Sequence, residues 1–327
     1  MRRADVAAAL VNASGGAVPG GAVSGEELAR SFGVSRTAVA KHVAALRALG
    51  YSIEATRGRG YRLMAAPDAC IPEEVCPRLR ASLWVACRGG LHTDSTNDDA
   101  KRLARRGAAE GTVVVAASQG AGRGRLRRAW VSPAGGVYAS VVLRPALSPS
   151  ALAPIAPVVA VGAARGLTAV GCTVGLKWPN DLLLDGRKLA GILVEAAVEA
   201  DRIDWVVAGI GVNVASAPHP GSACVRDAVP GVLVADVAAA VLDGVASAYR
   251  SFGAGGFPAV REEYRALGTL WGERITVRDG TGRVVTEGIA QDVDEDGALL
   301  VVGDEGTRAV TGGEVTLAAR DDLVDHR

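Results

Sequence analysis

Residues 177–195 read KWPNDLLLDGRKLAGILVE, and this stretch predicts a β-hairpin inside a mixed α/β unit. Residues 174–184 and 188–196 are typical of two strands, and Asp185-Gly186 between them is a strong turn signal. Lys177 and Lys188 are then expected on paired strands about a turn apart, with both ammonium groups facing one cleft. An ordinary surface hairpin is the alternative interpretation.

The scarcity of lysine argues against that alternative. The chain has four lysines among its 36 basic residues, so nearly all of its cations are arginine. A lysine kept against this bias suggests a site that needs a compact point charge rather than a planar guanidinium. Chance and surface placement still account for Lys101.

A second informative stretch, residues 120–130, reads GAGRGRLRRAW and follows a strand predicted over residues 112–118. It contains no Walker G-K-[ST] and lacks the glycine spacing of a dinucleotide fingerprint. Its glycines would let backbone amides approach phosphates, its arginines would bind phosphates bidentately, and Trp130 would cover an adenine face. A disordered nucleic-acid-binding loop is the alternative.

The rest of the chain predicts an α+β protein of three domains, at residues 1–66, 67–270 and 271–327. Further strands are expected at residues 137–143 and 205–214. Helices are expected at residues 151–169, with two prolines in the first turns, and at 234–252 and 257–267. Beyond residue 271, alternating residues and Gly-containing turns predict a small SH3-like β-barrel of about 50 residues.

The first domain predicts a winged helix-turn-helix. A helix is expected at residues 4–13, a capping box at Ser24–Glu27, and a third helix capped by Ser35, with Val39, Val43, Leu46 and Leu49 facing inward. Residues 51–56 and 61–63 alternate like the strands of a basic hairpin wing. The residues predicted to contact DNA, on the third helix and the wing, are Ser35, Arg36, Thr37, Lys41, His42, Arg57 and Arg59.

The distribution of charge agrees with the predicted division into domains. Residues 1–66 contain nine basic and four acidic side chains, a net +5, and the remainder carries −4, so only the first domain is expected to meet a polyanion.

The five cysteines have no C-x-x-C spacing and predict reduced thiols in a cytoplasmic protein. The start predicts no signal peptide, no apolar run predicts a membrane span, and no histidine pair predicts a metal site built by the protein alone.

Taken together, the motifs closely resemble the bifunctional biotin–protein ligase and biotin operon repressor family over nearly the whole chain. The motifs that carry the resemblance are D-S-T-N at residues 94–97, Gln119, the Gly/Arg loop, K-W-P-N-D…R-K-L-A-G-I-L-V-E ending at Glu195, G-I-G-V-N at residues 209–213 and G-G-E at residues 312–314. This set of motifs in this order is very specific to that family. The implied central domain resembles class II synthetases and biotin/lipoate ligases.

The resemblance also implies roles for individual residues. Those implied to bind biotin are Ser95, Thr96, Asn97, Gln119, Arg123, Gly124, Arg125 and Lys188. Those implied to frame ATP are Trp130, Lys177, Asn180, Asp181 and Asn213. Lys188 is implied to contact both the biotin carboxylate and the α-phosphate and, with Arg123 and Arg125, to form the catalytic set.

The implied reaction has two steps, with biotin and MgATP as substrates and Mg²⁺ held mainly through phosphates. The biotin carboxylate attacks the α-phosphorus and expels pyrophosphate, giving biotinoyl-5′-AMP. A lysine of a biotin carboxyl carrier domain then attacks the mixed anhydride and releases AMP. The implied partners are that carrier domain and operator DNA, with a homodimer forming when the adenylate is bound.

One position departs from the family pattern. The loop usually reads G-R-G-R-x-G-R-x-W, and Arg127 stands here where the second-half glycine is expected. If the closed loop needs a positive φ at this position, an arginine there is strained, and we expect near-normal adenylation with faster leakage of biotinoyl-AMP. Two other functions remain open: a biotin-sensing repressor without ligase activity, and a lipoate or octanoate transferase.

Overall fold

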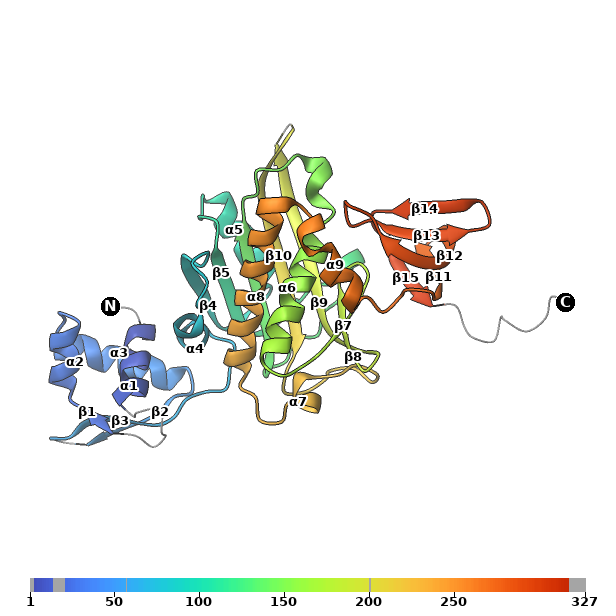
Figure 1. Ribbon diagram of the computed structural model, residues 1–327. Coiled ribbons are helices and arrows are strands. Elements are labelled where there is room, and N and C mark those ends of the chain that lie inside the picture. The colour runs from blue at the N-terminus through green and yellow to red at the C-terminus, as the bar shows by residue number, and fades with distance from the viewer. Residues whose placement is uncertain (1–2, 14–20, 57, 200, 318–327) are drawn as a thin grey trace.

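Three β-sheets succeed one another along the chain in the computed structural model, which describes residues 3–13, 21–56, 58–199 and 201–317. Figure 1 shows the central sheet with its helices between a small N-terminal unit and a C-terminal sheet. The three sheets fall within the three predicted residue ranges, and the division into domains itself stays a prediction.

The N-terminal unit is a three-helix arrangement with a small sheet in the order β1-β3-β2. Ser35 begins the third helix as predicted, because its Oγ accepts from the Ala38 N–H at 3.1 Å. Ser24 Oγ accepts from the Glu26 N–H, whereas the described hydrogen bonds include none to the Glu27 carboxylate. The elements are α1 (Arg3–Ala13), β1 (Ala22–Val23), α2 (Gly25–Ser31), α3 (Arg36–Ala48), β2 (Ser52–Thr56) and β3 (Gly60–Ala65).

A short connection, α4 (Pro72–Val75) and η1 (Cys76–Arg78), joins this unit to the central sheet. Ile71 packs in the core of the N-terminal unit, and so does Ala117 of the central sheet, so the two cores touch. The Tyr51 hydroxyl donates to the buried Glu74 carboxylate, which fixes the end of the N-terminal unit to the connection.

The prediction that all five cysteines are reduced thiols is wrong for two of them. Cys76 and Cys87 form a disulfide that ties η1 to β4 (Ala86–Thr93), while Cys70, Cys172 and Cys224 are free and buried. The sequence separation of 11 residues gives no hint of this pairing. The fold brings the two Cα atoms to 6.1 Å, within the range that a disulfide spans.

The central sheet has seven strands in the order β4-β5-β6-β10-β9-β8-β7. β4 runs parallel to β5, and the other neighbours are antiparallel. The remaining strands are β5 (Thr112–Gln119), β6 (Gly136–Leu143), β7 (Gly175–Lys177), β8 (Asp181–Leu184), β9 (Arg187–Glu199) and β10 (Arg202–Asn213).

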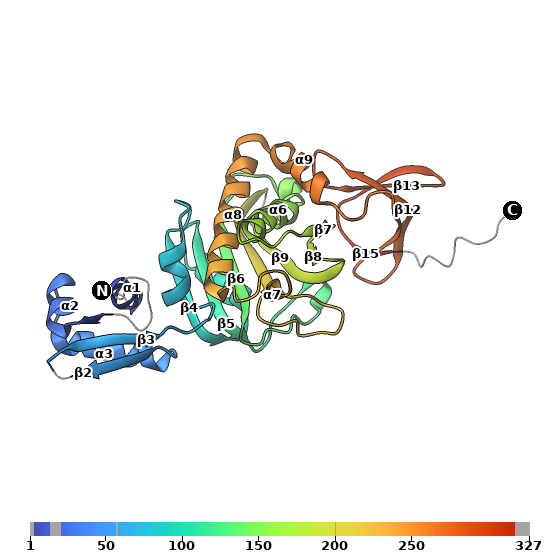
Figure 2. The same ribbon diagram turned by 60° about the horizontal axis from the view of Figure 1, so that its bottom comes forward.

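Helices cover both faces of this sheet because its strands alternate between two apolar cores. Val113 and Val115 of β5 join the main core, whereas Val114 joins the core beneath α5. Figures 1 and 2 both show α6 and α8 side by side across the main face. The helices of this unit are α5 (Thr96–Arg105), η2 (Arg125–Arg127), η3 (Pro149–Leu152), α6 (Ile155–Ala169), α7 (Val225–Ala228), α8 (Val234–Gly255) and α9 (Pro258–Leu267).

Two predicted elements of this unit need correction. The strand expected over residues 174–184 is two short antiparallel strands, β7 and β8, which reverse direction at the cis Trp178-Pro179 peptide. Lys177 therefore pairs with Asp181 of β8, and Lys188 lies one strand further on, in β9. The helix expected from residue 151 begins only at Ile155, after the separate turn η3.

The C-terminal sheet has the strand order β14-β13-β12-β11-β15. In the part of the chain that the structure describes, β14 and β15 do not pair, so the predicted SH3-like barrel is not confirmed as a closed barrel. Its strands are β11 (Arg274–Arg278), β12 (Val284–Val293), β13 (Leu299–Gly303), β14 (Gly306–Val310) and β15 (Glu314–Leu317). Among the described residues, no helix combines the length and apolar character needed to cross a bilayer.

Candidate functional site

A cavity of about 200 Å³ gathers nearly all of the residues predicted to bind small molecules. It lies between the start of α5, the Gly/Arg loop (residues 120–130), the β7–β8 turn, the middle of β9 and β10, and the start of β15. The predicted residues that line it are Ser95, Thr96, Asn97, Gln119, Arg123, Gly124, Arg125, Trp130, Lys177, Asn180, Asp181 and Lys188. A larger hollow of about 790 Å³ beside α8 contains none of them.

The floor of this cavity is polar and tightly bonded. Gln119 Oε1 accepts from the Thr96 N–H at 2.9 Å and from the Thr96 hydroxyl at 3.1 Å. Ser140 Oγ lies 2.8 Å from Thr96 Oγ1 and 2.6 Å from Asn97 Oδ1, and Ser95 Oγ caps α5. Such a fixed set of donors and acceptors suits a neutral polar ring.

Ser140 was missed by the sequence-based prediction. It is fully buried in β6, in the middle of an otherwise apolar run, and it orients both Thr96 and Asn97. A serine hydroxyl in a buried strand needs a hydrogen-bond partner. That requirement was the one feature of the sequence that could have identified Ser140 as part of the site.

Glycines of β9 and β10 let the side chains of the cavity lie directly on the sheet. A Cβ atom at Gly211 would come within 2.6 Å of the Trp130 indole nitrogen, and one at Gly191 within 3.2 Å of the same ring. A Cβ atom at Gly209 would come still closer to a side chain, within 2.1 Å of Asn97 Oδ1. The Trp130 indole nitrogen is buried against Gly211 and has no hydrogen-bond partner among the described residues.

Two cations approach the cavity from β7 and β9, the strands on either side of β8. Lys188 Nζ lies 2.7 Å from Asp181 Oδ1 and 5.5 Å from the centroid of the Trp130 ring. Within the described residues, no hydrogen bond or ion pair holds the Lys177 side chain, which also lines the cavity. The expectation that both lysines face one cleft is therefore supported, although their strands are not direct neighbours.

The Gly/Arg loop folds back on itself over the cavity. The Gly124 N–H donates to the Arg128 carbonyl at 2.8 Å, and the Trp130 N–H donates to the Gly122 carbonyl at 2.9 Å. Arg125 Nη1 donates to Asn180 Oδ1 at 3.0 Å, and burial lowers the pKa of Arg125 although Asp181 and Glu314 oppose that shift. The loop thus places a partly desolvated guanidinium next to the β7–β8 turn.

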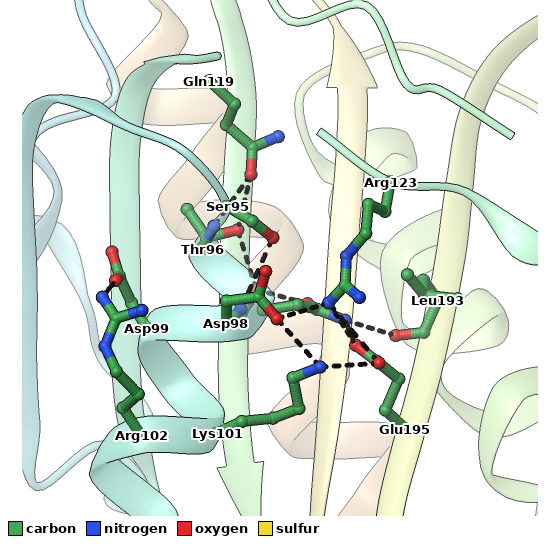
Figure 3. A network of polar contacts seen from close by, with 12 residues as sticks. Ser95, Thr96, Asp98, Asp99, Lys101, Arg102, Gln119, Arg123, Leu193 and Glu195 are labelled. Atoms are coloured by element: carbon green, nitrogen blue, oxygen red, sulfur yellow. Dashed lines mark hydrogen bonds and ion pairs between the residues drawn. The ribbon is translucent and has the colours of Figure 1, made fainter. Parts of the chain in front are cut away.

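Arg123 joins a second group of charges at the edge of the cavity, shown in Figure 3. Its Nη2 donates to Asp98 Oδ1 at 2.6 Å and to Glu195 Oε2 at 3.1 Å. Lys101 Nζ lies 2.9 Å from the same Asp98 oxygen and 2.8 Å from Glu195 Oε1. The loop is therefore bound to α5 and β9 through charges.

Asn213 is the predicted site residue that the fold keeps out of the cavity. It is buried, and its Nδ2 donates to the Ala223 carbonyl at 3.0 Å. The Ala223 N–H in turn donates to the Lys188 carbonyl at 2.9 Å. Asn213 therefore supports the backbone beside Lys188 instead of lining the ATP side of the cavity.

The predicted DNA-contact residues that the structure describes lie at the start of α3, on α3 itself, or in the turn between β2 and β3. Arg36, Thr37 and Lys41 are exposed on α3, and their side chains make no hydrogen bond or ion pair with another described residue. His42 is half-buried, Ser35 caps α3, and Arg59 is exposed in the turn between β2 and β3. Arg57 lies outside the described residues.

Comparison with known proteins identifies the family. A model of the biotin/lipoate A/B protein ligase family matches residues 89–213, an HTH domain model matches residues 19–62, and a biotin protein ligase C-terminal domain model matches residues 271–317. The bifunctional ligase/repressor BirA of Bacillus subtilis is 34% identical over 314 residues, which cover 90% of this chain and 94% of that protein. The chain belongs to the bifunctional biotin ligase/repressor family.

Other relatives of this ligase/repressor agree with that assignment. BirA of Escherichia coli is 30% identical over 91% of this chain and 94% of its own length. The biotin–[acetyl-CoA-carboxylase] ligase of Paracoccus denitrificans is 37% identical over 68% of this chain and 97% of its own length. A solved biotin protein ligase from Aquifex aeolicus, in complex with biotin and ATP, shares the fold with a TM-score of 0.62 at 24% identity, covering 72% of this chain and 99% of that one.

Proposed function

We propose that this ligase/repressor activates biotin with MgATP to biotinoyl-5′-AMP and transfers the biotinoyl group to a lysine of a biotin carboxyl carrier domain. In the first step, a biotin carboxylate oxygen bonds to the α-phosphorus while the bond to pyrophosphate breaks. In the second, the lysine amine attacks the acyl carbon, loses a proton and releases AMP. The observation that carries this proposal is one cavity holding the polar floor, the Gly/Arg loop and Lys188 together.

The floor is suited to the ureido ring of biotin. Ser95, Thr96, Asn97 and Gln119 present amide and hydroxyl groups that hydrogen bonds to one another or to neighbouring residues hold in place. A preorganised neutral set binds a neutral bicyclic ligand without the cost of burying a charge.

Lys188 is suited to the charge that develops between the two substrates. Asp181 holds its ammonium group at the wall of the cavity. A biotin carboxylate and an α-phosphate that bind on either side of this group could both contact it. Lys177, Asn180, Asp181 and Trp130 would frame the nucleotide. Catalysis then depends on positioning and on cations that stabilise an anionic transition state.

The Gly/Arg loop would exclude water from the mixed anhydride. Arg123, Gly124 and Arg125 already lie over the cavity, and Arg125 is held by Asn180. Hydrolysis of the adenylate competes with its transfer, so enclosure preserves the intermediate for the carrier lysine.

Mg²⁺ would arrive with ATP, bound through phosphate oxygens. Among the described residues, no group of three or more His, Cys, Asp or Glu side chains could hold a metal ion. Asp181 is a carboxylate on the nucleotide side, which fits a hard cation that takes one or two protein oxygens. When bound, the ion supplies positive charge against the phosphates.

We further propose that the N-terminal unit binds operator DNA, that the adenylate-loaded protein is a homodimer, and that the protein works in the cytoplasm. The match to an HTH domain and the exposed cations of α3 support the first point. A two-fold dimer would match a palindromic operator. We also propose that the C-terminal sheet closes into an SH3-like barrel.

The deciding experiment measures transfer of biotin from MgATP and biotin onto a purified carrier domain, for wild type and Lys188→Ala. We expect robust transfer by wild type and at least roughly a hundredfold loss in the variant, because removing one transition-state contact typically costs that much. Lys188→Arg should recover only part of the loss, since a guanidinium does not replace a point charge. Tight biotin binding without transfer by wild type would indicate a biotin-sensing repressor, and a thermal shift with lipoate but not biotin would indicate a lipoate transferase.

A further inference from the structure

Four charged side chains meet at the edge of the cavity, and the proposed function uses only Arg123 among them. Arg123 comes from the Gly/Arg loop, Asp98 and Lys101 from α5, and Glu195 from β9. Each carboxylate is within 3.1 Å of both cations. The group therefore connects a loop over the cavity to two rigid elements beneath it.

Glu195 also reaches the floor of the cavity. Its Oε2 accepts from Asn97 Nδ2 at 2.9 Å and from Arg123 Nη2 at 3.1 Å. Asn97 is buried, and its other amide atom lies against Ser140. One carboxylate oxygen thus joins the loop to the residues that would hold biotin.

Burial differs between the inner and outer parts of this group. The Lys101 and Glu195 side chains are 14% and 27% exposed, whereas Arg123 and Asp98 are 38% and 40% exposed. Burial alone would raise the pKa of Glu195, but hydrogen bonds from Lys101 and Asn97 and the charges of Lys101 and Arg123 outweigh it and lower the pKa. Glu195 is therefore a fixed anion at neutral pH, and the loop guanidinium is the partner that can leave.

Arg123 can keep this contact and still bind a substrate. A guanidinium has five N–H donors, and Nη2 alone makes the contacts to Asp98 and Glu195. Its Nε and Nη1 groups remain for a ligand in the cavity.

We propose that Glu195 is a positioning residue that latches the Gly/Arg loop, through Arg123, to the Asn97 floor of the cavity, and thereby sets how long the adenylate stays enclosed. Glu195 does not line the cavity and touches no substrate in this scheme. The proposal rests on the proposed function for its effect on the adenylate, whereas the latch itself is a property of the loop.

The test compares full-length wild type with Glu195→Gln in two measurements. Limited trypsin digestion followed by mass spectrometry reports loop opening, because the loop contains four arginines. Release of preformed biotinoyl-AMP reports enclosure. We expect cleavage after Arg127 and Arg128 and the release rate each to rise roughly fivefold, as for loss of a partly exposed ion pair, while adenylate formation changes less than twofold.

Glu199→Gln is the matched control. Glu199 lies at the exposed end of the same strand, and its one side-chain ion pair among the described residues is with Arg202 at 3.7 Å, so its substitution should change neither measurement. Glu195→Asp keeps the charge and should recover part of the wild-type loop protection.

A double-mutant cycle with Arg123→Gln separates a latch from simple support of the floor. If Glu195 acts through Arg123, Glu195→Gln adds nothing to the cleavage rate in the Arg123→Gln background. Fully additive effects, unchanged loop cleavage, or equal acceleration at arginines throughout the protein would each overturn the proposal. If wild type forms no adenylate, the proposed function fails, while the cleavage cycle still decides the latch.

Discussion

The Gly/Arg loop contains two residues in a conformation that disfavours side chains. Leu126 has a φ of 54° and Arg127 a φ of 60°, in the left-handed region. The sequence departs from its family at Arg127, and the structure now places the positive φ at that position. A non-glycine residue held there is strained by about 1 kcal/mol or more, which opposes the ordered form of the loop.

Replacing Arg127 by glycine should therefore improve enclosure of the adenylate. We expect Arg127→Gly to release preformed biotinoyl-AMP several-fold more slowly than wild type, with little change in the rate of adenylation. Release is measured by filter binding after removal of free substrates. Ala129→Gly is the control, because Ala129 has no positive φ and added freedom there should not slow release. Equal release by wild type and Arg127→Gly would show that strain at this residue does not limit retention.

Among the elements, α6 and α8 pack closely against each other on the sheet that holds the cavity. Gly162 and Gly166 of α6 face α8, and a methyl group at either position would collide with the backbone of α8. The two helices pack on the sheet through a shared apolar core. The distance between the two helices can thus be this short because the residues at their contact are glycines, which have no side chain.

Adding one methyl group at this contact should destabilise the protein. We expect Gly166→Ala to lower the free energy of unfolding by about 1–3 kcal/mol, because the backbones must move apart. Gly253→Ala, in the same helix pair but with nothing within 4 Å of its added Cβ, should be neutral or stabilise by up to about 1 kcal/mol. Urea denaturation measures both. Equal effects of the two substitutions would contradict the packing argument.

At the scale of the whole molecule, a series of contacts runs from the cavity to the connection with the N-terminal unit, which includes the residues just before α4. Ala223 bonds to the Lys188 backbone, and Arg226 further along pairs with Asp68 of the connection. Asp68 also accepts from the Val234 N–H at 2.7 Å, at the start of α8. The residues proposed for DNA binding and for biotin transfer are nevertheless different, and this allows the two activities to be tested separately.

Substitutions on α3 should weaken DNA binding without affecting transfer. We expect Arg36→Ala and Lys41→Ala each to reduce affinity for a random-sequence 40-base-pair duplex and to lower the slope of log affinity against log salt by about 1. Biotin transfer should stay at the wild-type rate. Arg202→Ala, an exposed arginine of the central unit, is the control and should leave DNA affinity unchanged. An unaltered salt slope in both α3 variants would place the DNA contacts elsewhere.

The sequence by itself determined the local elements and most of the cavity residues. Turn chemistry fixed the β8–β9 hairpin at Asp185-Gly186, the Ser35 cap fixed the start of α3, and apolar periodicity predicted α8 and α9. The ordered motifs gave the family and twelve residues that line one cavity. These features are readable because each depends on residues close together in the chain.

Features that depend on contacts between segments far apart in the chain were decided only by the tertiary structure. The Cys76–Cys87 disulfide, the burial of Ser140 beneath Thr96 and Asn97, and the exclusion of Asn213 from the cavity all follow from how distant segments pack together. The reversal at Trp178-Pro179 separated the two lysine strands for the same reason. Pairing partners in a sheet are chosen by the packing of both faces, and no single segment of sequence carries that information.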